Sequence, residues 1–197
     1  LPWMVVASAL FMESLVSTVI ATSLAAMSVD LGVDPLTLKL AFTAYFVALA
    51  IFIPISGWCA DRYGARTVFA AAIAVFTLSS VGCALAWDLH SLVVGRFCQG
   101  LGGAMMLPVG RLILLRVIPR KEMVSAMAWL SIPTLFAPIL GPPVGGFITT
   151  YYHWRGIFWL NVPIGLIGLA LALWWVPQVH GDRDKPMDWP GFVLTGG

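Results

Sequence analysis

Long runs of apolar residues, separated by short polar connections, make up most of this chain. Six of these runs are long enough for a helix to cross the hydrocarbon core of a bilayer, which is ~30 Å thick and takes about 20 residues. The apolar residues follow one another without strand-like alternation, so each run predicts a transmembrane α-helix. The expected spans are Trp3–Met27, Leu38–Cys59, Thr67–Ala86, Leu89–Ile118, Met123–Tyr151 and Gly156–Val176.

A seventh apolar run begins at Trp189 and continues to the last residue, Gly197. The segment before it, 180–191, is the most polar stretch and predicts a linker or a short amphipathic surface helix. We therefore expect a six-helix transmembrane bundle over 1–178, followed by a cytoplasmic linker and the start of the next transmembrane helix over 179–197. The chain begins without Met and stops inside a run, so we expect it to be the N-terminal half of a larger membrane protein, with the C-terminal half as its partner.

Composition and charge support this picture and add an orientation. The chain is 60% hydrophobic and 10% charged, with a mean hydropathy of +0.93, which is outside the range of soluble domains. The lipid bilayer is thus the expected environment, and the net charge of +2 gives no sign of a nucleic-acid partner. Basic residues follow spans two, four and six far more often than the other spans, which predicts a cytoplasmic N-terminus and cytoplasmic even-numbered loops. The seven residues after the even spans are Arg62, Arg66, Arg116, Arg120, Lys121, Arg183 and Lys185, against Lys39 and Arg155 after the odd ones.

Glu13 lies about ten residues into the first span, ~15 Å deep at 1.5 Å per residue and close to the bilayer midplane. An ionised carboxylate is costly at that depth, so Glu13 is expected to face a cavity or a partner, or to be protonated. Ser17 follows one turn later on the same face and is a candidate for lining such a cavity. Two interpretations remain open: a protonatable coupling site, or a neutral acid hydrogen-bonded within the bundle.

Arg96 and Gln99 share a face at the start of the fourth span. A guanidinium group does not deprotonate in proteins, so Arg96 needs acceptors or water around it. Gly100 and Gly103 then remove side-chain bulk, which allows neighbouring helices to approach closely. Arg96 is interpreted either as a fixed cation that helps a nearby acid release its proton, or as a structural arginine satisfied by backbone carbonyls.

Two further residues of the fourth span are candidates for a substrate cavity. Arg111 stands fifteen residues beyond Arg96, hence ~22 Å further along the helix. It is expected either to extend to the lipid headgroups or to face a polar cavity at the inner mouth. Met105 is a candidate for an apolar binding surface, with lipid-facing packing as the alternative.

Proline and glycine are concentrated near the end of the fifth span, at Gly141, Pro142, Gly145 and Gly146. Proline removes backbone donors, so this helix is expected to bend towards its outer end, where the bend could seal a pathway. The alternative is ordinary tolerance of these residues in membranes. The spacing of Pro142 and Gly145 echoes that of Pro54 and Gly57 in the second span, a placement that two inverted three-helix repeats would produce.

Four segments together resemble motifs of the major facilitator superfamily and, within it, of the drug:proton antiporters with 14 spans. The resemblance covers essentially the whole chain. The matching segments are the loop Gly57–Arg66, which holds Asp61, Arg62 and Gly64; the helix-four motif Arg96–Ala104; the helix-five motif Gly141–Gly146; and the start of helix six, His153–Gly165.

This resemblance implies proton-coupled efflux of small lipophilic or cationic compounds from a cavity between two six-helix halves. It implies an all-α fold with two inverted three-helix repeats in this half, a bacterial inner membrane and alternating access. The proton gradient would supply the energy, and no cofactor is expected. In that scheme Glu13 and Arg96 couple protons, while Gly57, Asp61, Arg62, Gly64 and Arg66 form a conformational switch, with Asp61 and Arg62 latching the cytoplasmic side against the other half.

One departure and two alternatives remain. The helix-one motif of this family usually carries an aspartate where this chain has Val16, and Glu13 stands one turn earlier on the same face. That change leaves proton coupling at this position open. A facilitator or symporter shares the fold, although the helix-five motif argues against it. An enzyme is not expected, because the sequence offers no Ser-His-Asp set, HExxH motif, phosphate loop or metal-ligand spacing. Near the connection between the fifth and sixth spans, the polar residues His153, Arg155 and Asn161 are expected at the membrane interface.

Overall fold

The computed structural model of the protein describes residues 2–178, which form six α-helices and one short 3-10 helix, η1 (Arg120–Glu122). All six α-helices are long and apolar enough to cross a membrane. The prediction of an all-α, multi-pass membrane bundle is thus confirmed. The expected linker and seventh helix, 179–197, lie outside the described residues. The helices are α1 (Pro2–Leu31), α2 (Pro35–Tyr63), α3 (Ala65–Ala84), α4 (Leu89–Val117), α5 (Met123–Tyr151) and α6 (Gly156–Trp175).

Polar caps explain where two of the helices begin. The Asp34 side chain accepts a hydrogen bond from the Leu36 N–H at 3.2 Å, and proline occupies the first position of α2. Asp88 and Ser91 form a capping box at the start of α4, with Ser91 N–H donating to Asp88 Oδ1 at 2.9 Å. The Ser91 side chain and N–H together hold the pKa of the Asp88 carboxyl below its usual range.

The polar segment Gly57–Arg66 is mostly helical, contrary to the prediction of a loop. Helix α2 continues to Tyr63, and Gly64 alone separates it from α3. The φ angle of Gly64 is +89°, a conformation that glycine adopts without strain. Asp61, Arg62 and Tyr63 interrupt the apolar run, but the backbone stays helical through all three.

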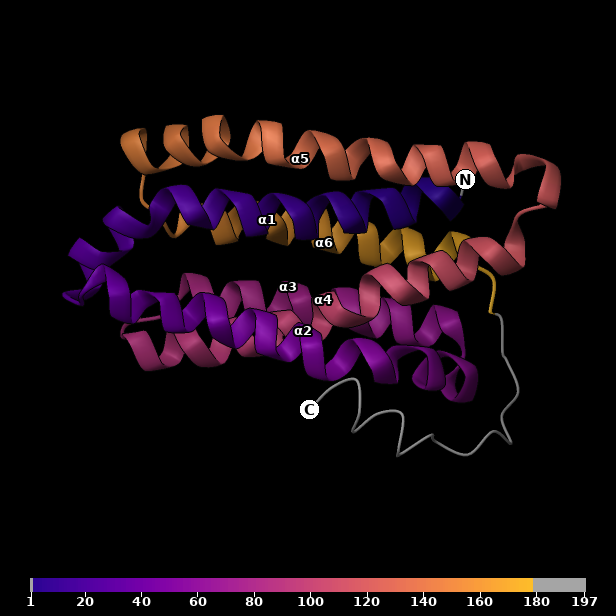
Figure 1. The fold of residues 1–197 in the computed structure, drawn as a ribbon, viewed down its shortest axis with the longest axis horizontal. Helices are drawn as coiled ribbons and strands as arrows, with labels where there is room; N and C mark the ends of the chain where they lie inside the picture. Colours follow the sequence, from indigo (N-terminus) through magenta and orange to yellow (C-terminus); the bar gives the residue numbers. More distant parts are fainter. Residues whose placement is uncertain (1, 179–197) are drawn as a thin grey trace.

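The bundle consists of two layers of three helices (Figure 1). In one layer, α4 packs extensively against both α2 and α3; in the other, α1 packs against α5 and α6. The main contact between the layers is the pairing of α3 with α6. Figure 1 shows α1, α5 and α6 in the upper part of the molecule and α2, α3 and α4 in the lower part.

This packing has the symmetry of two inverted three-helix repeats. Exchanging α1 with α4, α2 with α5 and α3 with α6 turns the α2–α4 contact into the α5–α1 contact. The α3–α6 and α1–α4 contacts map onto themselves, so the exchange preserves the pattern of packing.

We name the two ends of the bundle by their connecting glycines: the Gly64 end, between α2 and α3, and the Gly32 end, between α1 and α2.

Candidate functional site

The centre of the bundle holds a polar pair between α1 and α2. The Tyr45 hydroxyl donates to Glu13 Oε1 over 3.5 Å, at the long limit of a hydrogen bond. Ser17 donates to the backbone carbonyl of Glu13 at 3.1 Å, and its side chain also interacts with Tyr45. Glu13 is partly buried and Tyr45 is fully buried, whereas Val16, at the family's usual aspartate position, is packed in the apolar core.

Arg96 stacks over the Tyr45 ring. Its guanidinium carbon is 4.2 Å from the ring centroid, in cation–π geometry. Its NH1 donates to Gln99 Oε1 at 2.5 Å, and only 2% of the residue is exposed. Within residues 2–178, no ion pair joins Arg96 to a carboxylate. Tyr45 therefore contacts both Glu13 and the buried cation.

The hydrogen bonds continue from Gln99 through α3 to α6. Gln99 Nε2 donates to Ser80 Oγ at 2.8 Å, and Asn161 Nδ2 donates to the same oxygen at 3.3 Å. Asn161 is 1% exposed, so its side chain lies inside the bundle, and its place at the depth of the membrane interface remains a prediction. Its amide lies one turn inside α6, where Ser80 satisfies its donor group. The central polar chain, as we call Glu13, Tyr45, Arg96, Gln99, Ser80 and Asn161, thus crosses five helices and both layers.

Sequence analysis did not identify Tyr45 and Ser80, although a signal was present. Leu38, Ala41, Tyr45 and Ala48 are the buried residues of one α2 face at helical spacing. A hydroxyl on such a stripe needs a partner when it is buried, which would have marked Tyr45 as a member of a polar cluster.

The helix-four glycines make room for this chain. A Cβ atom on Gly100 would lie 2.5 Å from the Tyr45 carbonyl oxygen, so α2 and α4 touch through their backbones there. A Cβ on Gly103 would lie 3.1 Å from the Tyr45 hydroxyl and 3.4 Å from Glu13 Oε1. Gly103 therefore leaves the space in which these two groups meet.

The helix-five motif forms a close contact with α1, through two of its glycines. A Cβ on Gly141 would collide with Thr18, and one on Gly145 with Thr22 and Val19. Gly146 faces open space, and Pro142 is exposed. Helix α5 runs without interruption past Pro142, and the expected bend remains a prediction.

We expect Gly145→Ala to weaken the α1–α5 contact and Gly146→Ala to leave it intact. The new methyl group of Gly145→Ala has to displace Thr22 and the α1 backbone, a clash that costs about 1–3 kcal/mol of unfolding free energy. Thermal unfolding of the purified full-length protein in detergent measures the difference. Equal melting temperatures for the two variants would contradict this packing.

The predicted switch residues lie together at the Gly64 end, and two of them, Asp61 and Arg66, bind other helices of this half. Asp61 Oδ1 forms an ion pair with Arg116 NH2 at 2.6 Å, which joins the last turns of α2 and α4. The Arg66 guanidinium donates to the backbone carbonyl of Leu173 in α6. Arg62 is exposed and stacks over the Trp58 ring at 5.4 Å. Gly57 is exposed and faces open space.

Two cavities open between α1, α4 and α5. The first, of about 660 Å³, is lined by apolar side chains from the three helices together with Ser131 and the exposed Arg111. This position agrees with a cavity location for Arg111. Met105 is partly buried against the apolar core.

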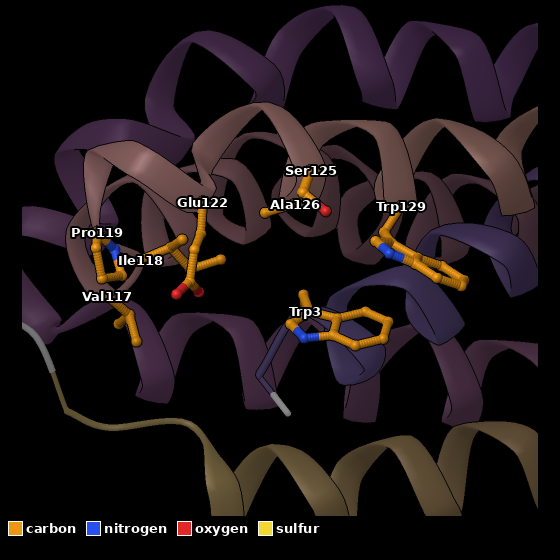
Figure 2. Close-up of a pocket in the computed structure, with 8 residues that line it drawn as sticks. All are labelled: Trp3, Val117, Ile118, Pro119, Glu122, Ser125, Ala126 and Trp129. Carbon is orange, nitrogen blue, oxygen red and sulfur yellow. The ribbon is translucent and has the colours of Figure 1, made fainter.

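The second cavity, of about 420 Å³, lies at the Gly64 end and is lined by Trp3, Glu122, Ser125, Trp129 and apolar residues 117–119 and 126. Figure 2 shows the Glu122 carboxylate on one side of this space and the two indole rings on the other. The ring centroids of Trp3 and Trp129 are 5.1 Å apart. Within the described part of the chain, no cluster of His, Cys, Asp and Glu could hold a metal ion.

Comparison with known sequences gives one consistent result. The family described as Major Facilitator Superfamily matches residues 6–193. Proteins named "Putative multidrug resistance protein MdtD" from Yersinia enterocolitica and Cronobacter sakazakii are 40% identical over 190 residues, which is 96% of this chain. The chain spans 40% of the length of these relatives.

Solved transporter structures share the fold of residues 2–178. The proton:xylose symporter XylE bound to 6-bromo-6-deoxy-D-glucose has a TM-score of 0.79 and 17% identity, over 90% of this chain and 44% of its own. The peptide transporter POT in complex with sulfate has a TM-score of 0.74 and 19% identity, over 87% and 37% of the two chains.

Proposed function

Since this chain belongs to the major facilitator superfamily, we propose that it is the N-terminal half of a proton-coupled exporter of small lipophilic or cationic compounds. The observation that carries this proposal is the contact of Tyr45 with both Glu13 and Arg96 in the middle of the bundle. The multidrug resistance names of the relatives support an exporter.

Glu13 is the proposed proton carrier, and Arg96 sets the balance between its two forms. Apolar surroundings favour the neutral carboxyl group, whereas a nearby cation in a medium of low dielectric constant favours the carboxylate. Tyr45 transmits this influence, because its hydroxyl binds the carboxyl group and its ring faces the guanidinium. A small displacement of α1 against α2 and α4 would therefore change the preferred protonation state of Glu13.

The Gly64 end is proposed to face the cytoplasm, in agreement with the positive-inside bias of its loops. The two cavities between α1, α4 and α5 then form the part of the substrate route that this half supplies. The larger one is mostly apolar, which suits lipophilic compounds, and the smaller one presents Glu122 and two indoles, which suit cations. Arg111 disfavours cations at its own position.

We expect Asp61→Asn to slow turnover while leaving substrate affinity and protein amount unchanged. The ion pair with Arg116 is about a quarter exposed on both sides, so its loss costs at most about 1 kcal/mol of stability. The proposed latch acts on the conformational change and not on the cavity, so the maximal rate of efflux should fall about tenfold while KM stays within about twofold.

Arg116→Gln is the matched control for this prediction. If Asp61 acts only through Arg116, both variants slow efflux equally; a larger effect of Asp61→Asn indicates a further contact with the other half. An unchanged maximal rate with a raised KM would contradict the latch.

A panel of toxic lipophilic cations and neutral compounds tests the function itself. Cells that carry the full-length gene should resist several of them, and a protonophore should remove the resistance. Resistance that survives the protonophore would overturn proton coupling. A symporter on the same fold, the alternative, would instead sensitise cells to compounds that it imports.

A further inference from the structure

At the Gly32 end, one arginine joins three helix ends. Arg155, directly before α6, donates from NH1 to Asp30 Oδ2 at 2.7 Å and from NH2 to the Ala86 carbonyl at 2.8 Å. Asp30 lies in the last turn of α1, and Ala86 follows the end of α3. The guanidinium thus connects α6 with α1 in its own layer and with α3 in the other layer.

Neighbouring side chains hold this arrangement in place. Trp154 Nε1 donates to Asp30 Oδ2 at 3.0 Å, and His153 Nε2 lies 3.3 Å from Asp30 Oδ1. Trp154 is 2% exposed, and its ring lies 4.5 Å below the Arg155 guanidinium carbon. The carboxylate of Asp30 therefore receives several donors around a buried aromatic anchor.

The Gly64 end contains the same construction in inverted form. Arg66, in the first turn of α3, binds the Leu173 carbonyl in the last turn of α6. Arg155, at the start of α6, binds the Ala86 carbonyl after α3. In both places a cation caps the carbonyl end of the third helix of the other repeat, where the helix dipole favours positive charge.

The ion pairs at the two ends correspond as well. Asp61 at the end of α2 binds Arg116 at the end of α4. Under the exchange of repeats, α2 becomes α5 and α4 becomes α1, and the pair at those ends is Arg155 with Asp30. The acid and the base have changed places, but the same helix ends are joined.

We infer that the segment His153–Gly156 is the counterpart, at the Gly32 end, of the Gly57–Arg66 motif, and that Arg155 staples the two helix layers together throughout the transport cycle. Glu13 lies on one layer, while Tyr45 and Arg96 lie on the other. A staple that keeps the layers in register therefore positions the proton site without touching it. The transport part of this inference rests on the proposed function.

Hydrogen exchange in the purified full-length protein tests the staple without reference to transport. Arg155→Gln should speed amide exchange severalfold in the last turns of α1 and α3 and leave the Gly64 end unchanged. Arg66→Gln should give the reverse pattern. His90→Gln, an exposed change in the first turn of α4 at the Gly32 end, should alter neither. Unchanged exchange in Arg155→Gln, or an increase spread evenly over all helices, would overturn the inference.

Transport kinetics test the positioning role. Arg155→Gln should lower the maximal rate of ethidium efflux about tenfold with KM within about twofold, because the cavity is intact and the layers have lost their register. Arg155→Lys keeps the charge beside Asp30, but a single ammonium group replaces two separate donor nitrogens, so it should recover part of the rate. Equal maximal rates of efflux for Arg155→Gln, Arg155→Lys and the wild type would contradict a positioning role.

A cross-link tests whether the contact between Arg155 and the end of α3 persists throughout the transport cycle. The test uses a variant whose native cysteines are replaced by alanine and which carries both Ala86→Cys and Arg155→Cys. Before cross-linking this variant should export slowly, and a short bis-maleimide that joins the two new cysteines should restore the rate of efflux. Efflux that is blocked by the cross-link would overturn a permanent staple. If the wild type exports nothing, the proposed function fails, yet the exchange experiment still tests the staple.

Discussion

Replacing Glu13 with glutamine should abolish proton-driven efflux while leaving the amount of protein in the membrane unchanged. Glutamine keeps the size of the side chain and its hydrogen bond with Tyr45, but it cannot release a proton. The cycle then loses its coupling step, and the initial rate of efflux should fall about a hundredfold or more. Efflux of ethidium from cells or inverted vesicles, with and without an imposed pH gradient, measures the effect.

Two companion variants separate coupling from structure. Glu13→Asp keeps the proton but shortens the side chain, so it should retain part of the activity. Ser14→Ala, on the next position of α1, should retain nearly all of it. Normal gradient-driven efflux by Glu13→Gln would remove this residue from the coupling mechanism.

Replacing Arg96 with glutamine should also lower the rate of proton-coupled efflux about a hundredfold, because the charge that favours the Glu13 carboxylate is lost. The protein should nevertheless fold. A buried cation without a carboxylate partner carries a desolvation cost, and its removal relieves that cost without leaving an opposite charge unpaired. Size-exclusion chromatography and thermal unfolding of the full-length protein, beside the efflux assay, provide both measurements.

Arg96→Lys distinguishes charge from geometry. Lysine keeps the cation but cannot stack its planar group on Tyr45 while binding Gln99, so efflux should lie between those of the wild type and Arg96→Gln. If Arg96→Gln loses protein in proportion to activity, Arg96 is a structural arginine, the alternative that the sequence left open.

Sequence periodicity was sufficient to predict six helices, because each must present about 20 apolar residues to the bilayer. It failed at residues 60–63, where Asp61, Arg62 and Tyr63 interrupt the hydrophobic pattern but continue α2. A membrane surface ends the apolar run and not the helix. Only Gly64, with its positive φ angle, ends the helix itself.

The charged members of the central polar chain could be found from the sequence, and the neutral ones could not. Glu13 and Arg96 are conspicuous because ions are costly inside a bilayer. Tyr45, Ser80 and Asn161 are ordinary residues of membrane helices, and their importance comes from meeting across four different helix pairs. Spacing along one helix carries no information about such contacts.

The contacts of Arg155 at the Gly32 end also could not be predicted from the sequence. The position of Arg155 between two spans predicts a place at the membrane interface, and the structure shows that it pairs with Asp30 at the Gly32 end. Its correspondence with Arg66 follows only from the three-dimensional symmetry of the repeats, since the two sequence segments share Trp, Arg and Gly but at different spacings.

Proton exchange on substrate binding tests the central claim most directly. Ethidium, or any compound that the resistance panel identifies, is added to purified full-length protein in weakly buffered detergent solution, and the pH change is recorded. An antiporter that uses Glu13 should release up to about one proton per bound molecule, and Glu13→Gln should bind the compound without releasing any. Equal release by both proteins, or proton uptake by the wild type, would contradict the mechanism.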